Sequence, residues 1–356
     1  MNVPEVSALP DARGVPPACG VGVPPACGVG VPPACGGVSE ALIGALRREP
    51  GRAVEVCAGG PVEGAEPYGE DLQLALYLCY ELHYRGLDGV DAAWEWDPEL
   101  LRLRGALEER FLGALRTDAP THETPAEALD ALLVEPVNGT GLSFYLRDEG
   151  ELWHLREYAA LRSLYHLKEA DPHAWAIPRL SGRAKAGLVA VEYDEFGAGR
   201  AERAHARLYA ELMADLGLNP AYGRYLEEAG TAEALCTVNL MSMLGLHRVL
   251  RGGLVGHFAA LETMSSPGSR RMAQALERAG AGEAAVGFHL EHVEADAVHE
   301  QLVRREVVGG LLEDEPWLAR DVAFGVDATV WLEDRFAEAV RGAWERGESA
   351  LRRPLS

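Results

Sequence analysis

Three side chains of metal-binding type recur on one face of a predicted helix in the C-terminal part of the chain. They are His292, Asp296 and His299. At about 100° per residue, Asp296 lies roughly 40° and His299 roughly 20° from His292, so the three point in one direction. Two imidazoles and a carboxylate suit a first-row ion such as iron or manganese better than calcium, which prefers oxygen ligands. The spacing therefore predicts a metal-binding helix face, and the competing interpretation is a solvated polar face.

A second fragment of the same kind lies upstream. Glu202-Arg-Ala-His205 repeats the acid-x-x-His spacing of Asp296 and His299. Residues three apart are neighbours on a helix, so each pair could bind one ion. Two such pairs on facing helices, joined by glutamates from other helices, form the ligand set of a carboxylate-bridged di-iron bundle. One pair occurs often by chance, whereas two in a helical chain indicate a di-metal centre.

The elements that must position these residues are almost all helical. Apolar residues at helical spacing predict helices over 38–48, 70–85, 98–116, 125–134, 146–170, 174–196, 199–216, 220–227, 231–250, 253–264, 268–279, 283–309 and 315–346. Only 52–57 and 142–146 could be strands. Residues 135–141 gather Pro, Asn and Gly and are the best candidate linker. We therefore expect an all-α protein with an N-terminal helical region at 38–141 and a helical bundle at 142–356.

The first 37 residues differ from the rest. They contain a tandem repeat of Gly-Val-Pro-Pro-Ala-Cys-Gly-Val with a period of eight residues. A Pro/Gly-rich repeat this short cannot bury enough surface to order itself, so residues 1–37 are predicted to be a disordered tail. Regular cysteine spacing could suggest metal capture, but repeat expansion in the coding sequence is the simpler explanation. Cysteines outside the repeat show no Cys-x-x-Cys pattern and are expected to be reduced thiols: Cys57, Cys79 and Cys236.

Composition narrows the class of partner. The formal net charge of −22 argues against nucleic-acid binding, which needs a basic surface. The sequence has no apolar run of roughly 18 residues or more, so no membrane span is expected. The segment Met1–Glu5 lacks the basic and apolar regions of a secretory signal, so a cytoplasmic location is the default expectation.

Four segments carry a resemblance to a known family. They are Leu167–Leu180, Glu192–Gly197, Asn239–Arg248 and Glu291–Gln301. Together they resemble the iron-containing redox enzymes with a haem-oxygenase-like fold, called haem-oxygenase-like di-iron oxidases and oxygenases. The resemblance covers roughly residues 150–345 and is most specific at the helix face described first. It implies a haem-oxygenase-like helical bundle.

The resemblance also implies a ligand set. Family members hold iron with a glutamate on the first core helix, a histidine on the next, a glutamate on a later helix and the final His-x-x-x-Asp-x-x-His. In this sequence the first three correspond to Glu169, His205 and Glu262. An additional carboxylate could come from Glu195 or Glu202.

Other residues near these positions have competing interpretations. Asp171 and His173 lie close to Glu169, but Pro172 should end the helix and turn both away. His289 could contact His292 without binding the metal itself, although a surface position is expected for His289.

The implied cofactors are two iron ions cycling between Fe2+ and Fe3+, with dioxygen as co-substrate and an external reductant. Two ferrous ions carry four positive charges, which four carboxylates would balance in a buried site. Three neutral histidines would leave coordination positions open for dioxygen.

The resemblance favours N-oxygenation of a small amine in specialised metabolism. The amine would be an amino acid or an amino-heterocycle such as an aminoimidazole, and the product a hydroxylamine or nitro compound. An alternative is oxidative C–C cleavage or desaturation of an amino acid or fatty acid. Another is a metal-free, thiaminase-like enzyme with Cys236 as nucleophile, and a passive iron-storage bundle also stays open. The expected partners are the amine, an electron donor and a second copy of the chain in a homodimer.

Overall fold

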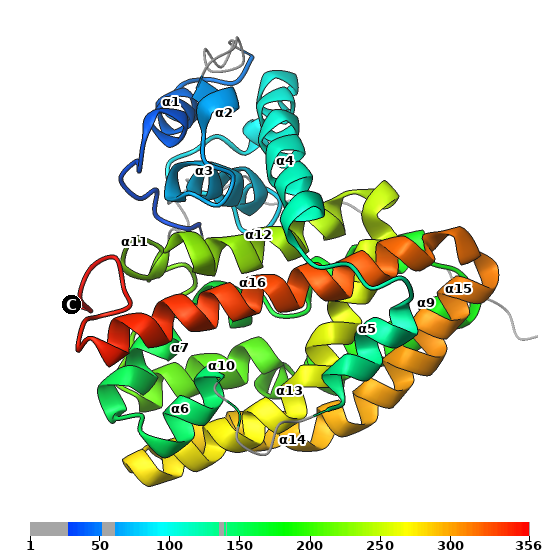
Figure 1. Cartoon of the computed structure of the whole chain (residues 1–356). Helices are drawn as coiled ribbons and strands as arrows, with labels where there is room; N and C mark the ends of the chain where they lie inside the picture. The colour runs from blue at the N-terminus through cyan, green and yellow to red at the C-terminus, as the bar shows by residue number, and fades with distance from the viewer. Residues whose placement is uncertain (1–27, 52–60, 135–138, 140, 356) are drawn as a thin grey trace, which may run out of the picture.

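The fold is built from helices (Figure 1). The computed structural model describes residues 28–51, 61–134, 139 and 141–355. Its α-helices are α1 (Gly37–Leu46), α2 (Pro61–Gly64), α3 (Glu70–Glu81), α4 (Pro98–Asp118), α5 (Pro125–Leu132), α6 (Leu142–Asp148), α7 (Leu152–His166), α8 (Asp171–Ala174), α9 (Gly182–Glu195), α10 (His205–Asp215), α11 (Leu226–Ala229), α12 (Ala232–Leu246), α13 (Arg251–Ala279), α14 (Glu283–Leu302), α15 (Gly309–Asp314) and α16 (Ala319–Glu345). This confirms the all-α prediction.

Of the two segments that could have been strands, the structure describes only one, and that one is helical. The stretch 142–146 is the beginning of α6, because its hydrogen bonds start from Gly141 in helical register. The stretch 52–57 lies outside the described residues. None of the helices in the described ranges is both long enough and apolar enough to cross a bilayer.

The helices form two packed parts. In Figure 1, α1–α4 stand above the long helices, and α3 packs on α12 while α4 reaches α16. Helix α5 instead lies against α13 and α16. The last helix of the expected N-terminal region therefore packs with the bundle, and the division at residue 141 stays a prediction.

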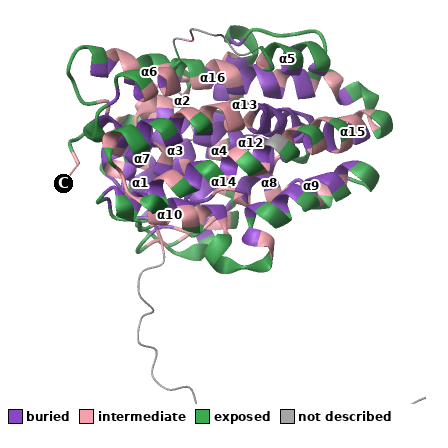
Figure 2. Ribbon diagram, turned by 90° about the horizontal axis from the view of Figure 1, so that it is seen from below, coloured by how far each residue is buried: buried purple, intermediate pink, exposed green. Residues whose placement is uncertain are grey.

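Helix α12 runs through the centre of the molecule. Every residue from Ala234 to Gly245 is buried. A helix that is apolar all round belongs in a core, because no face of it gains from contact with water. The surrounding helices turn buried faces inward and exposed faces outward (Figure 2). Helices α3, α7, α13 and α16 all contact α12, so it supports both parts of the fold.

Helices α13 and α16 cross at very short range. An added Cβ at Gly256 would overlap the carbonyl oxygen of Val322, and one at Gly325 would overlap that of Gly253. Such an approach is open only to residues without a side chain. These glycines bring the two helices close enough for side chains of both to line one cavity.

Helix α13 is continuous where two helices were predicted. The expected break between 253–264 and 268–279 is wrong, since α13 runs through Pro267. A proline inside a helix removes one hydrogen bond and costs about 3 kcal/mol. Helix α13 packs extensively against both α14 and α16. This packing outweighs the local penalty.

The predicted disordered tail is too long. Residues 28–36 are placed on the fold, and Val29 is 0% exposed. Val29 donates to Gly86 O at 3.0 Å and accepts from Asp88 N at 2.9 Å, forming a β-bridge with Leu87. The repeat cannot order itself, but a turn 57 residues further on, counted from Val29 to Gly86, provides the missing backbone partners. Residues 1–27 lie outside the described part of the chain.

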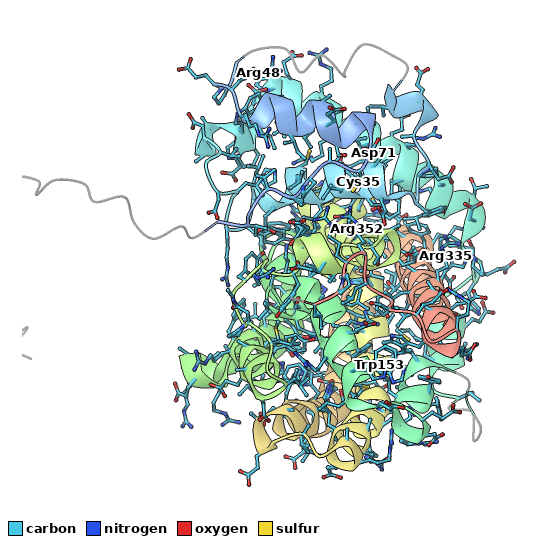
Figure 3. All side chains as sticks on the ribbon, turned by 90° about the vertical axis from the view of Figure 1, so that its left-hand side faces the viewer. Cys35, Arg48, Asp71, Trp153, Arg335 and Arg352 are labelled. Atoms are coloured by element: carbon cyan, nitrogen blue, oxygen red, sulfur yellow. The ribbon has the colours of Figure 1, made fainter. Side chains whose placement is uncertain are left out.

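The end of the repeat also meets the C-terminal segment (Figure 3). Asp71 accepts hydrogen bonds from the backbone of Val38 and Ser39 at 3.0 and 2.7 Å, which fixes the start of α1. Beside it, Arg352 approaches Cys35 and lies 3.4 Å from Glu70. The two ends of the described chain therefore close on α3.

Candidate metal centre

Seven buried or nearly buried side chains come together along one face of α14. His292, Asp296 and His299 come from α14 itself, one turn apart. The other four come from different elements: Glu169 from the turn after α7, Glu195 from the end of α9, His205 from the start of α10 and Glu262 from α13. The residues predicted to share a site are therefore brought together from five parts of the fold.

These side chains form two adjacent groups of possible ligands. Glu169, His205 and His292, the first group, each offer an atom within 4.8 Å of the others. Glu195, Glu262 and His299, the second group, meet the same limit. The two histidines of the α14 face therefore belong to different groups, His292 to the first and His299 to the second. Asp296 lies between the two histidines in sequence, and its Oδ1 is 3.7 Å from His299 Nδ1.

Glu195 reaches both groups. One carboxylate oxygen, Oε2, lies 2.7 Å from His205 Nδ1, and the other, Oε1, lies 3.7 Å from His299 Nδ1. Glu195 is therefore placed between the two groups, with one carboxylate oxygen toward each. Glu202, the other predicted source of an extra carboxylate, is exposed in the short turn η5 (Ala201–Arg203) and belongs to neither group. Helix α10 begins only at His205, so the helical spacing assumed for this pair does not exist.

Several polar atoms of the site have no hydrogen-bond partner. The buried unpaired atoms are His205 Nδ1, Glu262 Oε2, His292 Nε2, Asp296 Oδ2 and His299 Nδ1. Among these atoms, His205 Nδ1 lies 2.7 Å from a carboxylate oxygen of Glu195. A buried polar atom without a partner costs about 1–3 kcal/mol of folding free energy. Five such atoms in one site therefore require an explanation. Metal ions would satisfy these atoms, and a mixed imidazole and carboxylate set fits iron.

Two of the histidines are held in a defined orientation. His292 Nδ1 donates to the carbonyl oxygen of Phe288 at 2.8 Å, which leaves Nε2 facing Glu169 at 3.9 Å. His299 Nε2 donates to Asp194 Oδ2 at 3.2 Å, which leaves Nδ1 facing Glu262 at 3.5 Å. Metal-binding histidines characteristically donate their second ring N–H in this way.

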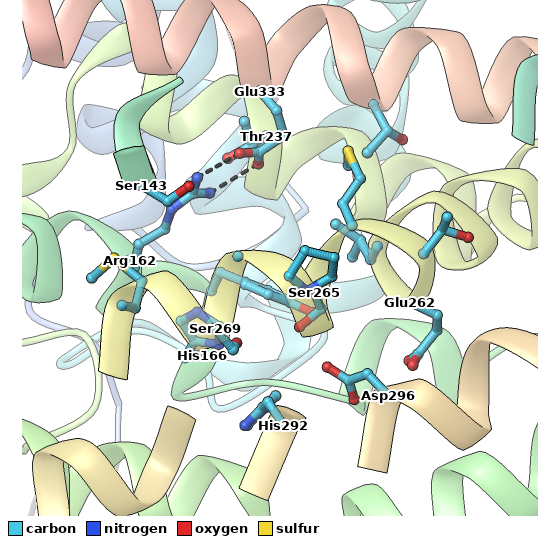
Figure 4. Close-up of a pocket in the computed structure, with 18 of the residues that line it drawn as sticks. Ser143, Arg162, His166, Thr237, Glu262, Ser265, Ser269, His292, Asp296 and Glu333 are labelled. Atoms are coloured by element: carbon cyan, nitrogen blue, oxygen red, sulfur yellow. Dashed lines mark hydrogen bonds and ion pairs between the residues drawn. The ribbon is translucent and has the colours of Figure 1, made fainter. Parts of the chain in front are cut away.

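A cavity of about 550 Å³ borders the two groups. Glu262 and Asp296 point toward one another at one side of it, and the ion pair of Arg162 and Glu333 lies at another (Figure 4). Arg162 donates to both carboxylate oxygens of Glu333, one at 2.9 Å. Much of the remaining lining is apolar: Leu240, Met241, Phe258, Leu261, Met272 and Phe288. The cavity has the size and lining of a small-molecule site.

The comparison with known protein families decides the identity of the fold. The model of a family described as iron-containing redox enzymes matches residues 156–334, half of the chain. The chain belongs to this family. All seven residues of the site fall within the matched segment. No curated protein matches the chain.

Membership in the iron-containing redox enzymes implies iron and an oxidoreductase activity, and it confirms the resemblance noted from the sequence. The unpaired atoms described above fit that ion independently. The assignment of individual ligands and the number of ions remain predictions.

Several residues of this iron-containing redox enzyme that line the cavity were missed or misplaced by the sequence interpretation. His166 lies 3.1 Å from both carboxylate oxygens of Glu169, and the spacing His166-x-x-Glu169 was a usable signal. His173 was expected to turn away but lines the cavity, because Ala170 adopts a left-handed conformation (φ 76°) that reverses the chain. His289, expected at the surface, is buried and lines the cavity.

Without metal, the site holds protons in place of ions. Burial opposes ionisation of Glu262 and, with Asp296 and Glu195 nearby, raises its pKa to about 8. Burial disfavours protonated His205 and His299, but Glu195 and Glu262 respectively outweigh it and raise both pKa values to about 9. Three candidate ligands therefore carry a proton near neutral pH that a metal ion must displace.

Iron binding is expected to release protons. At pH 7 the metal-free protein should hold protons on Glu262, His205 and His299, because pH 7 lies below their raised pKa values. Metal ligands must be deprotonated, so apparent Fe2+ affinity should rise from pH 7 toward pH 9 and then level off. Anaerobic calorimetry in buffers of different ionisation enthalpy measures the release. Binding heats that do not depend on the buffer would contradict it.

Asp194 is expected to support iron binding without touching the ion. Replacing Asp194 by Ala removes the acceptor of His299 Nε2–H, and losses of this kind weaken metal affinity roughly 10- to 100-fold. An anaerobic titration of Fe2+ against a competing chelator measures the change. Glu294→Ala, at an exposed position of α14, is the matched control and should bind iron like the wild type. Equal affinities in the two variants would exclude a supporting role for Asp194.

Proposed function

We propose that this iron-containing redox enzyme is a di-iron oxygenase that N-oxygenates a small amine. The amine would be an amino acid or an amino-heterocycle, and the product a hydroxylamine or nitro compound. The observation that carries the proposal is the pair of ligand groups, both reached by Glu195, at the wall of a cavity of small-molecule size. Dioxygen and an external reductant would be the other reactants.

The residues present fit two ferrous ions. Glu169, His205 and His292 would hold one ion, and Glu195, Glu262 and His299 the other, with Asp296 beside the second group. Four carboxylates supply four negative charges against the four positive charges of two ferrous ions. A nearly neutral cluster is what a buried site requires. Ions held there would supply electrons for the reduction of dioxygen.

The chain's own side chains would prepare the substrate. An amine reacts at nitrogen only after it has lost the proton of its ammonium form. His166 lines the cavity and is hydrogen-bonded to Glu169, so we assign it the role of accepting that proton. The apolar lining around Phe288 and Leu261 would exclude bulk water from the reacting atoms.

The other interpretations gain no specific support. Cys236, the nucleophile of a thiaminase-like enzyme, is buried, does not line the cavity and has a pKa raised by its burial. A thiolate nucleophile needs the opposite surroundings. Oxidative C–C cleavage or desaturation would use the same ligand groups, and it becomes an outcome of the test below.

The test uses protein loaded anaerobically with Fe2+ and then exposed to labelled dioxygen, a reductant and a panel of amines and amino acids. Mass spectrometry should find the label on the substrate nitrogen, and metal analysis should find two ions per chain. A cut C–C bond without label on nitrogen would replace this proposal by the alternative. Oxygen uptake that no substrate stimulates, or one ion per chain at saturation, would overturn it.

A further inference from the structure

Two buried histidines outside the ligand groups line the same cavity. His173 comes from α8 and His257 from α13, and each is 2% exposed. Their ring centres are 5.4 Å apart. Neither Nε2 atom has a hydrogen-bond partner among the described residues. Two buried, unpaired ring nitrogens on cavity-lining residues are expensive to maintain unless a molecule in the cavity pairs with them.

The hydrogen bonds around His257 fix which of its nitrogens carries the proton. Nδ1 lies 2.7 Å from Thr329 Oγ1, and the hydroxyl of Thr329 donates to the carbonyl oxygen of Gly325 at 2.6 Å. A hydroxyl has only one proton to donate, so Nδ1–H of His257 must be the donor in the first bond. In a neutral ring, Nε2 then carries a lone pair and can only accept.

The surroundings keep both rings neutral. Burial lowers the pKa of His257 well below its ordinary value, and the nearby His173 lowers it further. Burial also lowers the pKa of His173 to about 4, although Glu169 opposes the shift. Phe258 packs on His173 at 4.7 Å between ring centres, so an apolar ring covers one side of this histidine. An acceptor in such surroundings is selective for a ligand that brings its own donor.

We propose that His257, with His173 beside it, binds an N–H or O–H group of the substrate at the end remote from the reacting atom. His257 precedes Glu262 by five residues on α13, which is about 7.5 Å along the helix axis. The ligand is therefore a short molecule with two functions: a reacting group near the ligand groups and a hydrogen-bond donor at the histidine pair. That the reacting group is an amine rests on the proposed function, whereas the requirement for a remote donor does not.

Two probe molecules of equal size test this site. Aminopentanol and hexylamine have the same number of non-hydrogen atoms and differ by a terminal hydroxyl in place of a methyl group. Calorimetry on the anaerobic Fe2+-loaded protein, without oxygen, should show aminopentanol binding roughly tenfold or more tightly, since an unpaired buried acceptor is then satisfied. Equal binding of the two, or no binding of either, overturns the proposal.

Variants tie the preference to His257. In His257→Leu the preference for aminopentanol should vanish while the iron content stays unchanged. His257→Gln, which keeps an acceptor near the position of Nε2, should retain part of it. Thr329→Val removes the partner that fixes the proton on Nδ1 and should reduce it without altering the ring itself. A preference that survives in His257→Leu, or loss of iron from that variant, overturns the proposal.

The same probes separate this inference from the proposed function. Aminopentanol that binds with the expected preference but gains no labelled oxygen on nitrogen contradicts the oxygenase proposal and leaves the donor site standing. Labelled product from both probes at equal affinity contradicts the donor site and leaves the oxygenase proposal standing.

Discussion

Replacing Glu195 by alanine is expected to lower iron binding by roughly a hundredfold or more and to abolish oxygen uptake. The reason is its position, with one carboxylate oxygen 2.7 Å from His205 and the other 3.7 Å from His299. Its loss removes a contact from both ligand groups and one negative charge from a buried cluster. Even supporting residues of metal sites contribute 10- to 100-fold to affinity, so a carboxylate that reaches both proposed ligand groups should contribute at least the upper value.

The matched control is Glu202→Ala. Both glutamates were candidates for the additional carboxylate, but Glu202 is exposed and belongs to neither group. Its replacement should change iron content and oxygen uptake by less than about twofold, as expected for a surface substitution. Anaerobic loading, metal analysis and an oxygen electrode measure both variants in parallel. The assignment of Glu195 fails if the two variants behave alike, or if Glu202→Ala is the one that loses iron.

Gly256→Val is expected to prevent the bundle from folding stably. A Cβ at this position would overlap the carbonyl oxygen of Val322, and backbone atoms cannot move aside as a flexible side chain can. Separating α13 from α16 to make room would open the core on both sides. Overpacking costs typically 1–3 kcal/mol, and an overlap with backbone should reach about 3 kcal/mol or more.

Gly268→Ala, on the same helix, is the control for this effect. Nothing lies within 4 Å of a Cβ added there. Alanine in a helix interior is favoured over glycine by roughly 0.5–1 kcal/mol, so this variant should be slightly more stable than the wild type. Urea unfolding followed by circular dichroism compares the midpoints. A Gly256→Val protein as stable as Gly268→Ala would show that the helix crossing is looser than described.

The local part of the site was predictable from the sequence. His292, Asp296 and His299 are all buried, as helical spacing required of a single inward face. Periodicity works here because every residue concerned lies well inside α14. It could not show that the face divides between two groups, because the division depends on Glu169 and Glu262 arriving from elsewhere in the chain.

The failures occur where an element begins or where the fold overrides a local rule. Glu202 and His205 have helical spacing in sequence, but α10 starts at His205 and leaves Glu202 outside. Pro267 should interrupt a helix, yet tertiary packing of α13 keeps it continuous. His173 enters the cavity through the left-handed backbone at Ala170, a conformation that nothing in an alanine announces. Each outcome is set by contacts distant in sequence.

The docking of Val29 against Leu87 determines how the repeat can vary in number. Residues 14–21 form one copy of the repeat. Replication slippage that deleted this copy would leave the sequence from residue 22 onward unchanged, so Val29 would keep its place. Loss of two copies, residues 14–29, would instead place Arg13 directly before Gly30, in the buried position of Val29. It would also place Ala12 in the position of Gly28, where a Cβ would lie too close to the backbone of Leu87 and Asp88. Loss of a second copy should therefore destabilise the protein more than loss of the first, because only the second loss replaces Gly28 and Val29.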